Sequence, residues 1–94
     1  MSYRVEFTGR ARKELLKLPA QQQQFLLSWM NSHLSSCENP RLLKEARPLK
    51  GTKYGWRFKV GSYRILASVL DEELLILVVR AGHRQNKYAH LPKM

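Results

Sequence analysis

The spacing of the apolar residues changes about halfway along the chain, and this change constrains the fold more than any other feature. Between residues 11 and 33, apolar side chains recur every three or four positions, the period of a helix with one buried face. Between residues 54 and 80 they alternate with polar residues or run continuously, as in strands. Helices followed by successive strands predict an α+β fold, with the helices on one face of a sheet.

The first third of the chain predicts one strand and a helical hairpin. The alternation in residues 3–7 is typical of a half-buried strand. Thr8 can cap the helix that follows, and Pro19 both ends that helix and suits the first turn of the next. The apolar stripes of the two helices are Ala11, Leu15 and Leu18, then Phe25, Leu26, Trp29, Met30 and His33.

The second half predicts three consecutive strands. Residues 54–60 alternate, Gly61-Ser62 suits a two-residue type II′ turn, and a second strand follows at residues 63–70. After an acidic turn at residues 71–73, residues 74–80 are apolar on both faces, which is typical of a central strand. The predicted order is β-α-α-β-β-β, an antiparallel-rich twisted sheet with the helical hairpin on one face and the other face open.

Length and composition set further expectations. The 94 residues predict a single domain spanning residues 1–94, with a short helical turn at residues 42–46. Cys37 is the one cysteine, which excludes an internal disulfide and a metal site built on thiolates. The first residues lack the apolar run of a secretory signal, and no stretch approaches the roughly 20 apolar residues of a membrane span. We therefore expect a cytoplasmic protein without a membrane partner.

The charge balance predicts a polyanionic partner. Seventeen Lys and Arg oppose seven Asp and Glu, so the net charge is +10. No acidic residue lies between Ala46 and Leu70, and none follows Glu73. A nucleic acid, an anionic membrane surface or an acidic protein would each satisfy such a charge.

The predicted hairpin concentrates cations on one sheet face. With Gly61-Ser62 as the turn, Lys59 lies opposite Arg64, and Arg57 shares their face. Like charges directly opposed across strands cost some tenths of a kcal/mol, roughly, for each pair. A bound anion would offset that cost through charge-assisted hydrogen bonds. A merely solvated basic face is the alternative, which the scarcity of acids nearby disfavours.

Residues 82–88 add groups suited to metal-free RNA cleavage. Such an enzyme must activate a ribose 2′-hydroxyl, stabilise a phosphorane and protonate a 5′-oxygen. His83, Arg84 and Tyr88 could share these tasks, although a lone loop histidine is usually solvated and a terminal tyrosine usually packs on the core. His33, His83 and His90 have no carboxylate or thiolate at metal-binding spacing, and there is no Gly-rich phosphate loop. We expect neither a metal nor another cofactor.

Several segments, in order along nearly the whole chain, resemble the RelE/ParE toxins. They are Tyr3-x-Val5-x-Phe7, Ala11-x-Lys13-x-Leu15 with Lys17-Leu18, Pro48-Leu49-Lys50-Gly51, Trp56-Arg57-Phe58-Lys59, Gly61-Ser62-Tyr63-Arg64-Ile65, and Gly82-His83-Arg84 with Tyr88. Each segment is loose alone, but their order is specific. The resemblance implies the β-α-α-β-β-β microRNase-like fold and a toxin that a neighbouring antitoxin holds inactive.

Within that superfamily the chain is similar to the RelE branch of ribosome-dependent mRNA interferases. The resemblance implies that Lys59 helps to activate the 2′-hydroxyl, Arg64 stabilises the phosphorane, Arg84 assists the leaving 5′-oxygen and Tyr88 stacks on or orients a base. The products would be a 2′,3′-cyclic phosphate or 3′-phosphate and a 5′-hydroxyl. The expected RNA-binding residues are Arg47, Lys50, Lys53, Arg57 and Lys87.

Two positions depart from the family pattern. Some members carry a glutamate as general base just before the Pro-Leu-Lys-Gly turn. Arg47 occupies that position here, and Glu45 is not its obvious equivalent. Other members place a catalytic histidine at the C-terminal aromatic residue. His83 therefore stays a catalytic candidate, whereas we expect His90 to be solvated.

The resemblance leaves two other functions open. A ParE-like gyrase inhibitor shares the fold but does not need the cationic hairpin with Arg84 and Tyr88, and a nucleic-acid-binding domain without toxicity is the third possibility. The partners expected for the mRNA interferase are an acidic, partly disordered cognate antitoxin and the ribosome with its mRNA, including 16S rRNA contacts.

Overall fold

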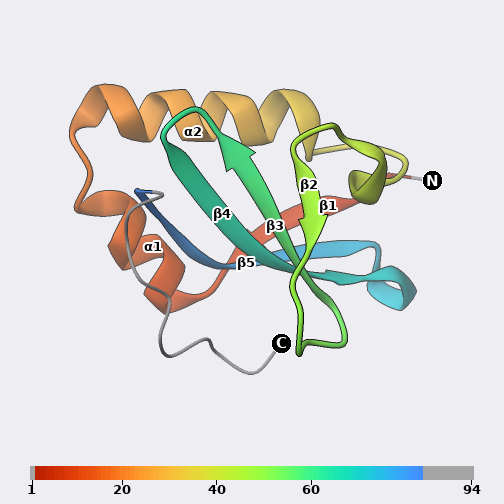
Figure 1. The fold of residues 1–94 in the computed structure, drawn as a ribbon. Coiled ribbons are helices and arrows are strands. Elements are labelled where there is room, and N and C mark those ends of the chain that lie inside the picture. Colours follow the sequence, from red (N-terminus) through yellow and green to blue (C-terminus); the bar gives the residue numbers. More distant parts are fainter. Residues whose placement is uncertain (1, 84–94) are drawn as a thin grey trace.

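The computed structural model describes residues 2–83, which form two helices and a five-stranded sheet (Figure 1). The elements are β1 Arg4–Phe7, α1 Gly9–Leu16, α2 Ala20–His33, β2 Ala46–Pro48, β3 Gly55–Val60, β4 Tyr63–Leu70 and β5 Leu75–His83, with short 3₁₀ helices at Pro40–Leu42 and Asp71–Glu73. The strand order is β1-β5-β4-β3-β2, and only the β1–β5 pair is parallel. The predicted α+β class is confirmed.

The helical hairpin begins where the sequence predicts. The Thr8 hydroxyl accepts the backbone N–H of Ala11 at 3.1 Å and so caps α1. Pro19 is the N-cap residue of α2, where its missing N–H costs nothing. No helix within residues 2–83 combines the length and the apolarity needed to cross a membrane.

The core lies between α2 and one face of the sheet. Leu26 and Met30 of α2 and its C-cap residue Leu34 are buried in one cluster with Phe58 and Ile65 of the sheet. In Figure 1, α2 passes behind the hairpin of β3 and β4. Strand residues on this face alternate with residues on the opposite face, so the packing of α2 decides which side chains the opposite face presents.

The β3–β4 hairpin has the predicted register. Val60 pairs with Tyr63 and Lys59 with Arg64, across a turn in which Gly61 has a φ of +59°. That value suits the first central residue of a type II′ turn and is strained for any residue with a side chain. The turn therefore confirms that Lys59 and Arg64 share one face.

One strand was not predicted, and the predicted helical turn at residues 42–46 is wrong. The helical turn instead covers Pro40–Leu42, where the Asn39 side chain accepts the Arg41 N–H at 3.1 Å. Ala46 then begins β2, which pairs with β3. A three-residue strand ending in proline gives no periodic signal, and proline is tolerated there because β2 is an edge strand.

β5 runs three residues beyond its predicted end at Arg80 and is irregular. The β4–β5 register shifts between Leu66 and Ala67, so that Leu66 pairs with Arg80 and Ala67 with Val78. Val79 is the extra residue of this β-bulge. The bulge reverses the facing of every later residue in β5 relative to a regular strand.

The face opposite α2 is not open across its whole width. Leu66 and Arg80, near the middle of the sheet, are 1% and 9% exposed. Arg47 and Lys59, toward the β2 edge, are exposed. The expectation of an open face therefore holds only for the part formed by β2 and β3.

Candidate anion-binding face

Strand pairing arranges the cations in two rows across the sheet face opposite α2. In the first row Arg47 of β2 pairs with Arg57 of β3, which pairs with Leu66 of β4, which pairs with Arg80 of β5. Paired residues point to the same side of a sheet. The first row therefore holds three arginines on three different strands.

The second row lies one step closer to the hairpin turn. Lys59 pairs with Arg64, and Arg64 pairs with Gly82. Glu45 extends this row, because its carbonyl accepts the Lys59 N–H at 3.1 Å. We call the surface formed by Arg47, Arg57, Lys59 and Arg64 the cationic face.

Two guanidinium groups of the cationic face have an unused donor. The Nε atoms of Arg57 and Arg64 are buried, yet neither finds a hydrogen-bond partner among residues 2–83. An unsatisfied buried donor costs about 1–3 kcal/mol, more when it is charged. Arg47 differs, since its Nη1 donates to the carbonyls of Lys44 and Ala46 at 3.2 and 2.8 Å. Arg57 and Arg64 are therefore the two arginines of the cationic face with an unused, buried Nε donor.

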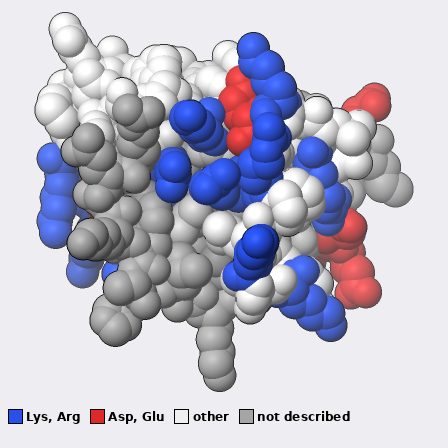
Figure 2. Space-filling model, in the orientation of Figure 1, with Lys and Arg blue, Asp and Glu red and all other residues white. Residues whose placement is uncertain are grey.

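A depression of about 410 Å³ opens on this face. Figure 2 shows Lys and Arg side chains gathered over β2, β3 and β4 on the side turned to the viewer. The depression is lined by Lys44, Glu45, Arg47, Arg57 and Lys59. A surface with so many cations attracts phosphate groups. The depression also contains one carboxylate, that of Glu45.

His83 is not part of the cationic face. It pairs with Tyr63, whose side chain packs against the core on the α2 side, and the two rings meet edge to face at 5.5 Å. In a strand without the bulge at Val79, His83 would point to the side of Arg64. The structure thus separates this predicted catalytic residue from Lys59 and Arg64.

The other predicted site residues divide into two groups. Lys50 and Lys53 are exposed in the turn between β2 and β3, where Lys53 Nζ lies 5.3 Å from the centre of the Tyr54 ring. They do not line the depression. The catalytic candidates Arg84 and Tyr88, together with Lys87 and His90, lie outside the described residues.

Three charged residues near the face were not among the predicted site residues. Lys44 and Glu45 directly precede β2, a strand without a periodic signal, and line the depression. Arg80 reaches it through the bulge but is held by Glu14 of α1, with Nη2 and Nε each within 3.1 Å of Oε2. For Lys44 and Arg80 the only available signal was charge, whereas Glu45 was compared with the glutamate of some family members and judged not to be its obvious equivalent.

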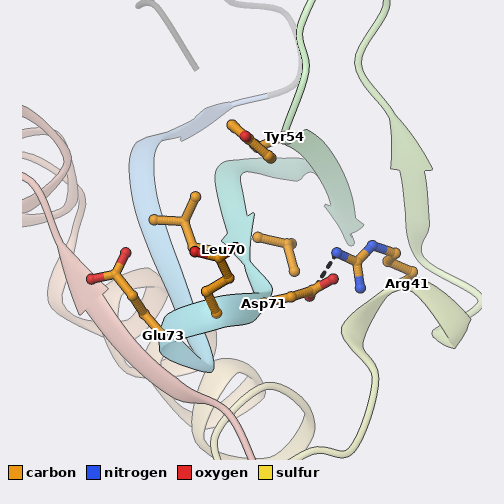
Figure 3. Close-up of a pocket in the computed structure, with 7 residues that line it drawn as sticks. Arg41, Tyr54, Leu70, Asp71 and Glu73 are labelled. Carbon is orange, nitrogen blue, oxygen red and sulfur yellow. Dashed lines mark hydrogen bonds and ion pairs between the residues drawn. The ribbon is translucent and has the colours of Figure 1, made fainter.

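A second depression, of about 510 Å³, lies at the far end of β4 from the hairpin turn (Figure 3). Asp71 there accepts hydrogen bonds from the Arg41 guanidinium at 2.8 Å and from the Tyr3 hydroxyl. The hydrogen bond from Tyr3, and after it the bond from Arg41, holds the pKa of the Asp71 carboxyl below its ordinary value. The same bond to Asp71 raises the pKa of the Tyr3 hydroxyl. Arg41 thus neutralises Asp71, whereas Glu72 and Glu73 leave the depression with an excess of negative charge.

Comparisons with known proteins agree with this geometry. The family model described as the ParE toxin of type II toxin-antitoxin systems matches residues 5–88. A RelE-like toxin protein of Escherichia coli is 35% identical over 88 residues, covering 90% of this chain and 86% of that protein. The mRNA interferase toxin RelE of Escherichia coli K12 is 32% identical over 87 residues, again covering 90% of this chain and 86% of that protein.

A solved structure has the same fold. The toxin-antitoxin complex RelBE2 of Mycobacterium tuberculosis contains a chain that superposes with a TM-score of 0.76 at 28% identity, covering 89% of this chain and all of that one. Sequence, fold and family model therefore agree, and the chain belongs to the RelE/ParE superfamily of type II toxin–antitoxin toxins, in its RelE-like branch.

Proposed function

We propose that this toxin is a ribosome-dependent, metal-independent endoribonuclease that cleaves translated mRNA and so inhibits translation. One observation carries the proposal: Arg57 and Arg64 present buried guanidinium donors without partners on an exposed cationic face. The cost of keeping them unpaired is offset when a phosphate accepts their hydrogen bonds. The name of the K12 relative, an mRNA interferase toxin, supports RNA as the source of that phosphate.

The proposed chemistry uses charge instead of a metal ion. A ribose 2′-oxygen attacks the neighbouring phosphorus, and Arg64 stabilises the extra negative charge of the phosphorane. Lys59 is opposite Arg64 in the register and is proposed to assist the attacking hydroxyl. The family resemblance adds two further roles to the proposal. Arg84 assists the leaving 5′-oxygen, and Tyr88 stacks on or orients a base.

The remaining cations are proposed to hold the RNA chain. Arg57 and Arg47 line the depression beside Lys59, and Lys50 and Lys53 continue the positive surface into the following turn. Lys87 is assigned to the same task from the sequence alone. Such contacts to mRNA and 16S rRNA position a substrate without reading its bases.

The proposed protein partner is an acidic cognate antitoxin. The RelBE2 structure of Mycobacterium tuberculosis is a toxin-antitoxin complex, and its toxin fold is the fold of this chain. A net charge of +10 favours a partner of opposite charge. By covering the cationic face, such a partner would block access of RNA to Arg57 and Arg64.

Gyrase inhibition is the second candidate function, because the matching family model is that of the ParE toxins. The two functions differ in what they require of the cationic face. RNA cleavage needs Arg64 at the reacting phosphate, whereas inhibition of a topoisomerase needs no phosphorane to be stabilised.

The test is induction of the toxin in cells, followed by primer extension to map mRNA 5′-ends. Arg64→Ala and Arg84→Ala are compared with Arg12→Ala, which removes an equal charge from the exposed side of α1. Cleavage within translated codons that stops when elongation is blocked, and is lost in the first two variants alone, supports the proposal. Intact messages with arrested replication and an SOS response would assign the protein to gyrase inhibition.

A further inference from the structure

The last residues of β5 lie next to the proposed chemistry. Gly82 pairs with Arg64, the residue proposed to stabilise the phosphorane. Arg84, proposed to act at the leaving 5′-oxygen, comes two residues later in the sequence. The bulge at Val79 lies just before this segment. Because a slip of one residue moves every later side chain to the other face of the sheet, the register of this segment decides which groups meet the RNA.

Along its other side, this segment of β5 is held by α1 and the residue before it. Within residues 2–83, β1 pairs with β5 only as far as Val78. The Thr8 hydroxyl then donates to the Val79 carbonyl at 3.4 Å. Glu14 accepts the Ala81 N–H at 3.3 Å. These two side chains thus take the place of a neighbouring strand along the bulged part of β5.

The Glu14 carboxylate binds two consecutive residues of β5. Its Oε2 accepts hydrogen bonds from Nη2 and Nε of Arg80 at 2.8 and 3.1 Å, while its Oε1 accepts the Ala81 N–H. Among the ion pairs of residues 2–83 this is the most buried, since the Arg80 and Glu14 side chains are 11% and 22% exposed. A slip of β5 by one residue would break both contacts at once.

A buried ion pair contributes little net stability, because both ions lose their water, but it requires one particular geometry. We propose that Glu14 is a positioning residue that holds β5 in its bulged register, so that the segment leading to Arg84 begins beside Arg64. This inference rests on the function proposed above. Glu14 acts through Arg80 and Ala81, not on the RNA itself. Apolar side chains could replace the ion pair in stability but not in this role, because their contacts have no preferred direction.

The variant that separates position from stability replaces both partners, Glu14→Leu together with Arg80→Met. Glu14→Leu alone would leave a buried guanidinium uncompensated, which is strongly destabilising, whereas the apolar pair leaves no buried charge. We expect its urea denaturation midpoint to stay close to that of the wild type. Single-turnover cleavage of mRNA on purified, programmed ribosomes should become about 10- to 100-fold slower. Affinity for the ribosome should be unchanged, because the net charge is unchanged.

The matched control removes another ion pair in the same way. Arg4→Met with Glu6→Leu replaces a pair that is 2.7 Å long and exposed on β1, and this variant should cleave at the wild-type rate. A readout independent of activity is hydrogen exchange of the Ala81 amide, which should be faster without Glu14 than in the wild type.

The path through the end of β5 is tested by combining variants. In an Arg84→Ala background the apolar pair should lower the cleavage rate by less than about twofold, because the residue that it helps to position is already gone. An equal loss with and without Arg84 would overturn the proposal, since the damage would then not pass through this segment.

Two further results would overturn the role of Glu14 and leave the proposed function standing. One is wild-type cleavage by the folded Glu14→Leu, Arg80→Met variant. The other is a large loss of stability in that variant, which would mean that the ion pair supports the fold itself. Failure of the wild type to cleave programmed mRNA would instead overturn the proposed function, and the role of Glu14 with it.

Discussion

At the scale of single residues, two features of the cationic face lower the stability of the folded chain. Arg57 and Arg64 bury Nε donors without partners, and Arg64 faces Lys59 directly across the hairpin. Both features disfavour the folded toxin when no anion is bound. The unbound toxin should therefore become more stable when either guanidinium is replaced by an apolar side chain.

Arg64→Met tests that expectation. We expect the free energy of unfolding to rise by about 1 kcal/mol, because an unpaired donor and a like-charge contact are both removed. Urea denaturation of the isolated toxin measures it, and Arg12→Met on the exposed side of α1 should change stability by less than about 0.5 kcal/mol. A large loss of stability in Arg64→Met would mean that the guanidinium has a structural role.

The cluster of Tyr3, Arg41 and Asp71 should make stability depend on pH. Because hydrogen bonds from Tyr3 and Arg41 lower the pKa of the Asp71 carboxyl below 3.8, its contribution is present above that value and is lost as pH falls through the lowered pKa. The pKa of the Tyr3 hydroxyl is raised above 10.0 by its bond to Asp71, so its contribution is complete below pH 10 and is lost as pH rises further.

Asp71→Asn is the corresponding variant. At pH 7 we expect it to be less stable than the wild type by no more than about 1 kcal/mol, since the Asp71 side chain is 61% exposed and water screens the ion pair. The difference should shrink when urea denaturation is repeated near pH 2. A difference that is equal at both pH values would show that the charge of Asp71 is not the cause.

At the scale of elements, the β3–β4 hairpin was predictable from sequence and β2 was not. Turn length sets hairpin register, so Gly61-Ser62 was enough to place Lys59 opposite Arg64. β2 has three residues and ends in Pro48, so its pairing with β3 had no periodic signal. Arg47 was predicted to bind RNA, but its place opposite Arg57 was not predictable. His83 was placed with the cations because the bulge at Val79, which turns it to the α2 side, cannot be deduced from an apolar run.

Gly61→Ala should weaken the hairpin that holds the cationic face together. With a φ of +59°, an alanine is strained, and its Cβ would lie 3.5 Å from Phe25. We expect a loss of about 1 kcal/mol. Gly9→Ala is the control, because no atom lies within 4 Å of its Cβ position and α1 gains a better helix former. Equal thermal denaturation midpoints for the two variants would contradict the proposed strain.

At the scale of the whole molecule, the net charge of +10 should dominate RNA affinity. Each cation that contacts a phosphate of single-stranded RNA contributes about 0.7 to the slope of log affinity against log salt. Lys59→Gln should therefore lower the magnitude of that slope by about 0.7. Lys17→Gln, next to α1, should leave it unchanged.

Fluorescence anisotropy of a labelled oligoribonucleotide, titrated with toxin between roughly 50 and 200 mM salt, measures the two slopes. Equal slopes for Lys59→Gln and Lys17→Gln would mean that the RNA is attracted by the overall charge and does not contact the cationic face.

The contact between Glu14 and β5 has a consequence for the toxin once it is free of a partner. Within residues 2–83, no strand lies beside β5 beyond the end of β1, and Glu14 accepts the Ala81 N–H at that edge, at 3.3 Å. At the other side of the sheet, β2 is short, charged and ends in Pro48, which cannot donate to a further strand. Both borders of the sheet thus discourage strand-by-strand stacking of toxin molecules, so a released toxin can stay dispersed while it searches for its target.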